Sequence, residues 1–141
     1  MSETVDIPLI FSIFAIIISI LHFLLNYISK KRTQIPTINI SLNELPPYKD
    51  RNTKTLISIQ NTGSSIAYKP KLYITYSYAE GVVHIPIDDA VINPNEIIER
   101  REKLVEPPSG THEIKFIVGV GKRRFLGGEF EFTKTVEIAV K

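Results

Sequence analysis

Residues 7–28 read IPLIFSIFAIIISILHFLLNYI, and this apolar run divides the chain. All but six of its positions are Ile, Leu, Phe or Tyr. As a helix rising about 1.5 Å per residue, the run would span about 30 Å, which matches the hydrocarbon core of a bilayer. The sequence therefore predicts one transmembrane helix over residues 7–28.

The six remaining positions of the run fall on one side of the predicted helix. At 100° per residue they lie within an arc of about 80°. We call this set the polar face, and it consists of Pro8, Ser12, Ala15, Ser19, His22 and Asn26. Lipid tails cannot hydrogen-bond hydroxyl, imidazole or amide groups, whereas a neighbouring helix can do so and can pack closely on small residues. We therefore predict that the polar face packs against another integral membrane protein or a second copy of the chain.

Each of these residues also has an interpretation that needs no partner. Pro8 can simply begin the helix, Asn26 can lie among the lipid headgroups, and the serines can hydrogen-bond to their own helix backbone. His22 is then the costly residue. It could instead relay a proton or bind a cofactor, although a lone histidine is weak support for chemistry.

The two flanks of the run differ in charge. Residues 1–6 form a short acidic head, and residues 29–34 form a basic stop that contains Lys30, Lys31 and Arg32. The positive-inside rule then places the N-terminus outside and the C-terminal domain in the cytoplasm of a cell membrane. The sequon Asn39-Ile40-Ser41 favours the opposite orientation, because glycosylation requires an outward-facing domain. A cleaved signal peptide is not expected, because the head is acidic and no A-x-A pattern follows the run.

The remaining residues, 35–141, alternate apolar and polar side chains in short segments. This period of two is typical of strands with one buried and one exposed face. The predicted strands lie within residues 35–42, 55–61, 71–78, 83–87, 114–120 and 130–140. Residues 96–104 allow either a helical turn or a charged edge strand. The predicted fold is all-β: an immunoglobulin-like antiparallel β-sandwich preceded by one transmembrane helix.

Three segments of the domain resemble a known family. Residues 61–67, Asn-Thr-Gly-Ser-Ser-Ile-Ala, are similar to the N-x-G turn that ends the second strand of CARDB-type immunoglobulin-like modules of archaea and bacteria. Residues 92–96 resemble the turn before their fifth strand, with Asn95 in place of glycine, and residues 110–114 resemble the step that opens their sixth, with His112 in place of the usual aromatic residue. The resemblance covers about residues 55–120. It implies a non-catalytic adhesion or docking module, and most such modules are extracellular.

Composition argues against several kinds of partner and site. The chain has no cysteine, so disulfides, thiolate catalysis and cysteine-ligated zinc are impossible. The formal net charge is +2, and the domain without the basic stop is almost neutral, so a nucleic-acid partner is not expected. The domain offers only His84 and His112, too few for a histidine-based metal site. Asp88, Asp89 and Asn93 lack the spacing of a calcium loop, and we expect a solvated turn there.

The segment from Gly119 to Arg124 superficially resembles a phosphate-binding loop. It lacks the G-x-x-x-x-G-K-[ST] spacing and lies between two predicted strands, so nucleotide binding is not expected. We interpret it as a hairpin tip that carries Lys122, Arg123 and Arg124. A solvated loop is one possibility. The other is that these residues, like those of the basic stop, contact anionic lipid headgroups or an acidic partner.

The sequence thus leaves two main classes of function, and neither needs a cofactor, a metal or catalysis. An enzyme or transport component that uses His22 is a third. The first is an accessory or structural subunit that docks onto a larger membrane protein complex through Ser12, Ser19, His22 and Asn26. The second is a membrane-tethered binding or adhesion module for a protein or glycan, such as the anchor of a surface filament. The polar face favours the first class, because a simple tether could be uniformly apolar.

Overall fold

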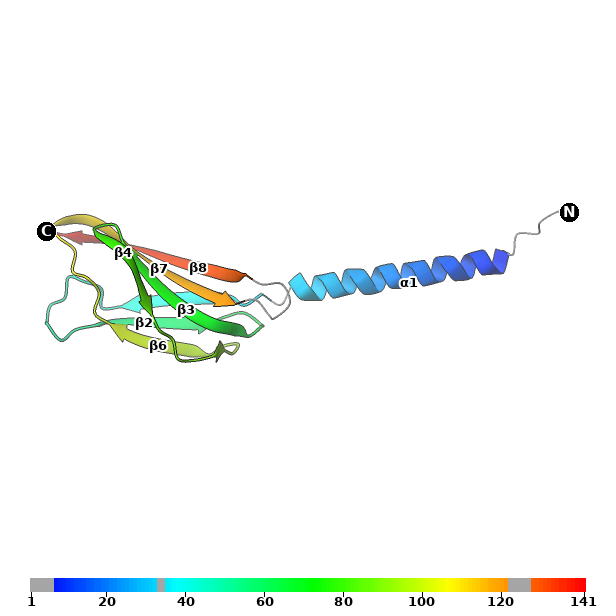
Figure 1. The fold of residues 1–141 in the computed structure, drawn as a ribbon, viewed down its shortest axis with the longest axis horizontal. Helices are drawn as coiled ribbons and strands as arrows, with labels where there is room; N and C mark the ends of the chain where they lie inside the picture. The colour runs from blue at the N-terminus through cyan, green and yellow to red at the C-terminus, as the bar shows by residue number, and fades with distance from the viewer. Residues whose placement is uncertain (1–6, 33–34, 122–127) are drawn as a thin grey trace. The chain divides into compact units, whose positions relative to one another are not determined.

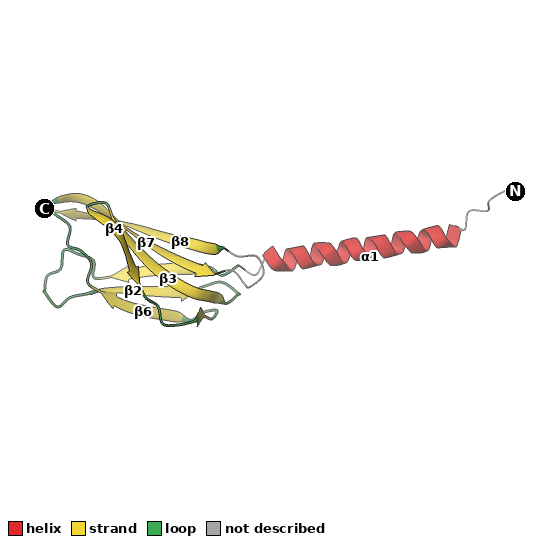
Figure 2. Cartoon of the chain, in the orientation of Figure 1, coloured by secondary structure: helices red, strands yellow, loops and turns green. Residues whose placement is uncertain are grey.

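A computed structural model describes residues 7–32, 35–121 and 128–141, with the side chains of residues 31 and 32 excepted. The chain forms two compact units, Met1–Ile35 and Pro36–Lys141. The first unit contains one helix, α1 (Ile7–Arg32), which is drawn in red in Figure 2. Its segment Ile7–Lys30 is long and apolar enough to cross a membrane. It has a mean hydropathy of 2.6, and none of it is buried. The predicted helix is therefore present, and its bulky side chains are exposed.

The second unit consists of two antiparallel sheets. Their strands are β1 (Ile38–Asn43), β2 (Thr55–Asn61), β3 (Ala67–Tyr76), β4 (Ala79–Ile85), β5 (Val91–Ile92), β6 (Ile97–Glu102), β7 (Gly110–Gly121) and β8 (Glu129–Val140). One sheet has the order β1-β2-β6, and the other has the order β4-β3-β7-β8 with β5 also paired to β3. Figure 1 shows the two sheets as two layers. This confirms the prediction of an antiparallel β fold after one helix.

The core lies between the two sheets and is almost wholly aliphatic. In the smaller sheet, Ile40, Ile59 and Ile98 stand side by side across three strands. In the larger sheet, Leu72 pairs with Val118 across β3 and β7, and both are fully buried. Because side chains alternate along a strand, the inward positions are apolar and the outward positions are mainly polar, as the period of two predicted.

Irregularities in β3 shape the edge of the larger sheet. The pairing of β3 with β7 shifts between Tyr68 and Lys71, where Lys69 has a φ of 44°. A positive φ is unfavourable for a residue with a Cβ, so the local backbone must be held by its surroundings. The Lys69 amide donates to the Ala90 carbonyl at 2.8 Å, which ties this bulge to the connection between β4 and β5.

Two of the edge strands, β6 and β8, carry charges that discourage pairing with other chains. The segment 96–104, which allowed two interpretations, contains β6, an edge strand of the smaller sheet. Arg100 lies opposite Ile57 and therefore on the inward side of β6. On β8, Lys134 lies opposite the buried Phe116, also on the inward side, yet its side chain is exposed. Inward-pointing charges are a known way to block edge-to-edge association.

Candidate functional site

The polar face of α1 is the first candidate surface. Because α1 is continuous over its whole length, the six residues of the face share one side of it. The Ser12 hydroxyl donates to the Pro8 carbonyl at 3.0 Å, and the Ser19 hydroxyl donates to the Ala15 carbonyl at 2.8 Å. The two serines therefore need no partner outside the helix for their hydrogen bonds, as the alternative interpretation allowed. What the two serines contribute to a contact surface is a small side chain.

His22 and Asn26 differ from the serines. Both side chains are exposed. Within the described helix, we find no hydrogen bond made by either one. The two residues are one turn apart, so an imidazole and an amide lie next to each other on the same side. They are the two side chains of the polar face that can still hydrogen-bond to a neighbouring helix.

The predicted basic contacts are only partly described. Lys30, Lys31 and Arg32 are the last three residues of α1, and Lys30 is exposed. Lys122, Arg123 and Arg124 lie outside the described residues. The flanking strands do form a hairpin pair, with Gly121 opposite Glu129. These two strands, β7 and β8, are antiparallel neighbours, as the predicted strand context requires.

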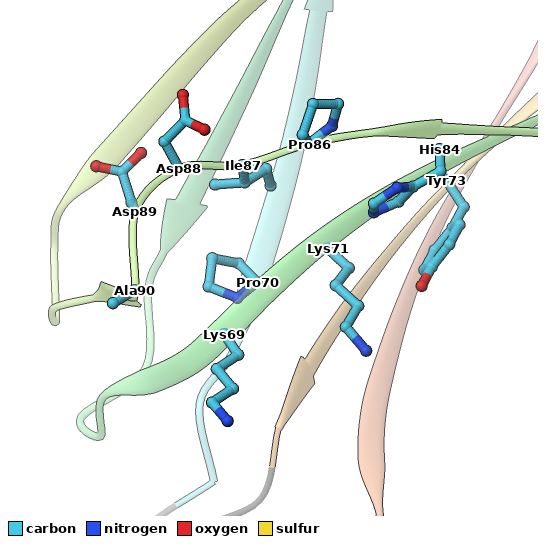
Figure 3. A pocket seen from close by; sticks show the side chains of 10 residues that line it. All are labelled: Lys69, Pro70, Lys71, Tyr73, His84, Pro86, Ile87, Asp88, Asp89 and Ala90. Carbon is cyan, nitrogen blue, oxygen red and sulfur yellow. The ribbon is translucent and has the colours of Figure 1, made fainter.

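A second candidate surface is an open groove of about 520 Å³ beside β3 (Figure 3). It lies where β4 ends and the chain continues towards β5, and its apolar lining includes Pro70, Pro86 and Ile87. His84 is exposed, as its alternation with Val83 and Ile85 predicts. Its ring lies against the Tyr73 ring, with 5.1 Å between centroids. No sequence pattern predicts this groove. It depends on the bulge at Lys69 and on the contact of Lys69 with Ala90, which follows about twenty residues later in the chain.

Of the charged residues that line the groove, Lys71 and Asp89 form ion pairs. The Lys71 ammonium meets the Glu129 carboxylate at 2.7 Å, and the Asp89 carboxylate meets the Arg100 guanidinium at 3.2 Å. The hydrogen bond and charge of Glu129 raise the pKa of Lys71 above its ordinary value. In Figure 3, Lys69 and Lys71 extend to one side of the groove while Asp88 and Asp89 point to the other. The groove thus offers both donors and acceptors beside an aromatic ring.

The segment considered for calcium does not gather its residues around one point. Asp89 is bound to Arg100, whereas the Asn93 amide nitrogens of backbone and side chain both donate to the Glu96 carboxylate. Among the described residues, no group of three or more His, Asp and Glu side chains could hold a metal ion. Strand β5 lies between Asp88 and Asn93 in the chain, so the two residues belong to different segments.

One buried side chain joins the turn after β2 to the segment before β6. The Asn61 side-chain amide donates to the carbonyls of Ser65 at 2.7 Å and Ile92 at 2.9 Å, and its oxygen accepts from the Gly63 amide at 3.0 Å. Asn95, in the turn before β6, has a φ of 65°. Asparagine tolerates this conformation better than most residues. Both asparagines are therefore structural residues of this end of the sandwich.

Tyrosines hold the opposite ends of the strands together. The Tyr48 hydroxyl lies 2.8 Å from the Thr55 hydroxyl and accepts from the Leu104 amide at 3.0 Å. The Tyr78 hydroxyl donates to the Val105 carbonyl at 2.6 Å. Burial raises the pKa of Tyr78 to about 12, so this hydroxyl stays protonated as a donor at physiological pH. These contacts tie loops to the core, and we assign them a structural role.

Comparisons with known proteins give no further guide. No family model, curated protein or solved structure matches the chain. The function must therefore be argued from the two surfaces, the polar face of α1 and the groove beside β3.

Proposed function

We propose that this protein is a non-catalytic, single-pass membrane protein that serves as an accessory or structural subunit of a larger membrane protein complex. Its helix α1 would dock through the polar face, while the sandwich, which we propose to be immunoglobulin-like, covers or bridges soluble parts. The observation that carries the proposal is the pair His22 and Asn26. Both are polar, exposed and without a hydrogen bond in the described helix, in a segment otherwise suited to lipid.

The physical argument is the cost of polar groups in a bilayer. An imidazole or amide that faces lipid loses its hydrogen bonds with water and gains none, whereas a neighbouring helix can supply them. Interhelical hydrogen bonds of this kind contribute about 0.6–2 kcal/mol each. The small side chains of Ser12, Ala15 and Ser19 would let the neighbouring backbone approach closely.

Charges on two edge strands of the sandwich, β6 and β8, support a docking role for α1. Lys134 on β8 and Arg100 on β6 place charge on the inward sides of two edge strands. A domain built to recruit partners by strand addition would leave such an edge free. We therefore propose that the helix, and not a sheet edge, provides the main contact with the complex. The side of the membrane we propose for the sandwich is the cytoplasm, on the basis of the charges around α1.

A second candidate function rests on the groove beside β3. An open groove with an aromatic pair and with donors and acceptors from Lys69 and Asp88 would suit a membrane-tethered binding module for a protein or glycan. In that case α1 would be a tether, and its polar face would have no specific partner. The resemblance to CARDB-type modules supports this alternative.

The test is to tag the C-terminus, extract the protein from its native membrane in mild detergent, and determine the mass and protein content of what co-purifies. We expect a stoichiometric membrane protein that is lost when His22 and Asn26 are both replaced by leucine. The matched control places two substitutions on the opposite side of α1, Ile17→Leu and Leu24→Ile, and should retain the partner. A lone monomer, or a complex that the leucine variant leaves intact, would overturn the docking role.

A further inference from the structure

The polar face of α1 follows a spacing that specifies a helix pair. Its members are separated by 4, 3, 4, 3 and 4 residues. This alternation is the seam of a left-handed coiled coil, in which two helices cross at about 20° and keep one side in contact along their length. The seam runs over the whole apolar part of α1, so it could be covered by one partner helix.

The chemistry of the polar face makes it complementary to itself. The hydroxyl protons of Ser12 and Ser19 are donated within α1, so Asn26 carries the argument. An asparagine amide has both donors and an acceptor and can therefore pair with a second asparagine amide. No charged side chain lies between Ile7 and Ile28, so a second copy would bring no like charges together. Two chains inserted in the same direction are parallel, and a two-fold axis would then place Asn26 opposite Asn26 and His22 opposite His22.

We propose that the occupant of the polar face is the α1 of a second copy of this chain, in a parallel, left-handed pair. The inference rests on the proposed function in one respect, namely that α1 lies in the membrane and docks through this face. It adds the identity of the neighbouring helix: the part of the complex that α1 contacts through this face is a second copy of this chain. The Asn26 pair fixes the register of the two helices, and Ala15, with the smallest side chain of the face, marks their closest approach.

The absence of cysteine makes the full chain suitable for disulfide scanning. Single cysteines are introduced at Ala15, Ser19 and His22, and, as matched controls on the opposite side, at Ile10, Ile17 and Leu24. The variants are oxidised in native membranes, where a disulfide forms only if the two Cα atoms come within about 7 Å. We expect disulfide dimers from the first three positions and little from the controls. Equal yields at all six positions, or a maximum at the controls, would overturn the pair.

A second substitution tests the role of Asn26. In the Ala15→Cys chain, Asn26→Leu should lower the apparent association constant about threefold to thirtyfold, and Asn26→Gln should largely retain it. An unchanged dimer yield with Asn26→Leu would refute the proposed register contact.

The same cysteines separate this inference from the proposed function. Each is labelled with a benzophenone maleimide and irradiated in the native membrane, so that it joins whatever protein lies next to it. Adducts that contain only a different membrane protein at positions 15, 19 and 22 would overturn self-pairing and support docking onto another subunit. Adducts of twice the chain's own mass support the pair. No adduct at any of these positions would overturn both.

Discussion

Lys71 and Glu129 form an ion pair of 2.7 Å that crosses over Gly119 on the outer side of the larger sheet. Lys71 lies on β3 and Glu129 on β8, and the strand between them, β7, presents Gly119 opposite Lys71. A Cβ at position 119 would lie 3.3 Å from a Glu129 carboxylate oxygen. Glycine therefore leaves the space through which two side chains on non-adjacent strands meet.

Glu129→Gln should bring the pKa of Lys71 back towards its ordinary value, because the hydrogen bond and charge of Glu129 are what raise it. A raised lysine pKa stabilises the fold below the pKa of the unfolded chain, and this contribution disappears as the pH rises through the folded pKa. The variant should thus be slightly less stable at neutral pH and equal to the parent at strongly alkaline pH. The Lys71 titration by NMR and urea unfolding at several pH values measure both effects. A Lys71 pKa that does not move would contradict the pairing.

Asn61→Leu should destabilise the sandwich by about 3 kcal/mol, because it leaves the buried carbonyl of Ile92 and its neighbours without their partner. The measurement is the shift of the urea midpoint in detergent solution. Gln60→Leu is the matched control, since Gln60 precedes Asn61 on the same strand and its side chain faces outward. We expect the control to change the stability by less than about 0.5 kcal/mol. Equal losses in the two variants would argue against the role of Asn61 in joining the turns.

The bounds of the strands were predictable where alternation was uninterrupted. The strand Thr55–Asn61 has the predicted bounds, because four inward residues alternate with three outward ones without a break. The strand predicted at 71–78 instead spans Ala67–Tyr76. Its bulge at Lys69 shifts the phase of the alternation, so that Ala67 and Leu72 are both buried although five positions apart. The two-residue strand β5 is too short for any periodicity to reveal.

The two candidate surfaces differ in how far sequence could reach them. The polar face depends only on positions within one helix, so a rotation of 100° per residue suffices to collect it. The groove depends on the bond between Lys69 and Ala90 and on the ion pair between Asp89 and Arg100. Such pairings between segments distant in sequence leave no local pattern. Similarly, the sequence allowed Ser12 and Ser19 to hydrogen-bond either to their own helix or to a partner, and the internal bonds are seen only in the structure.

Lys134→Val should increase self-association of the protein. The substitution replaces an inward charge by an apolar residue in the middle of the long edge strand β8, where Phe116 already lies opposite. Removing the charge extends the apolar side of an edge that can then pair with another chain. Light scattering after size-exclusion chromatography in detergent measures the change in mass. Thr133→Val, on the outward side of the same strand, is the control and should leave the mass unchanged. If Lys134→Val also leaves the mass unchanged, the lysine does not protect the edge of β8 from pairing.

The orientation in the membrane can be read from two single cysteines, Ser2→Cys and Lys141→Cys, because the chain has no other thiol. The charges around α1 predict an N-terminus outside and a cytoplasmic sandwich. A membrane-impermeant maleimide should therefore label Ser2→Cys in intact cells and Lys141→Cys only after permeabilisation. The reverse pattern would place the sandwich outside. Asn39, whose side chain is exposed on β1, would then be an accessible sequon.

The serines of α1 allow size to be separated from hydrogen bonding. Their hydroxyls already donate to Pro8 and Ala15 within the helix, so a double change of Ser12 and Ser19 to alanine removes no bond to a partner. This variant should keep whatever α1 binds, with a change in affinity of less than about threefold. Replacing both serines by leucine should abolish binding, because bulky side chains keep the backbone of the neighbouring helix at a distance. Co-purification from native membranes compares the two variants. Loss of the partner with alanine would mean that the hydroxyls reach across to it, and retention with leucine would mean that the contact lies on another side of the helix.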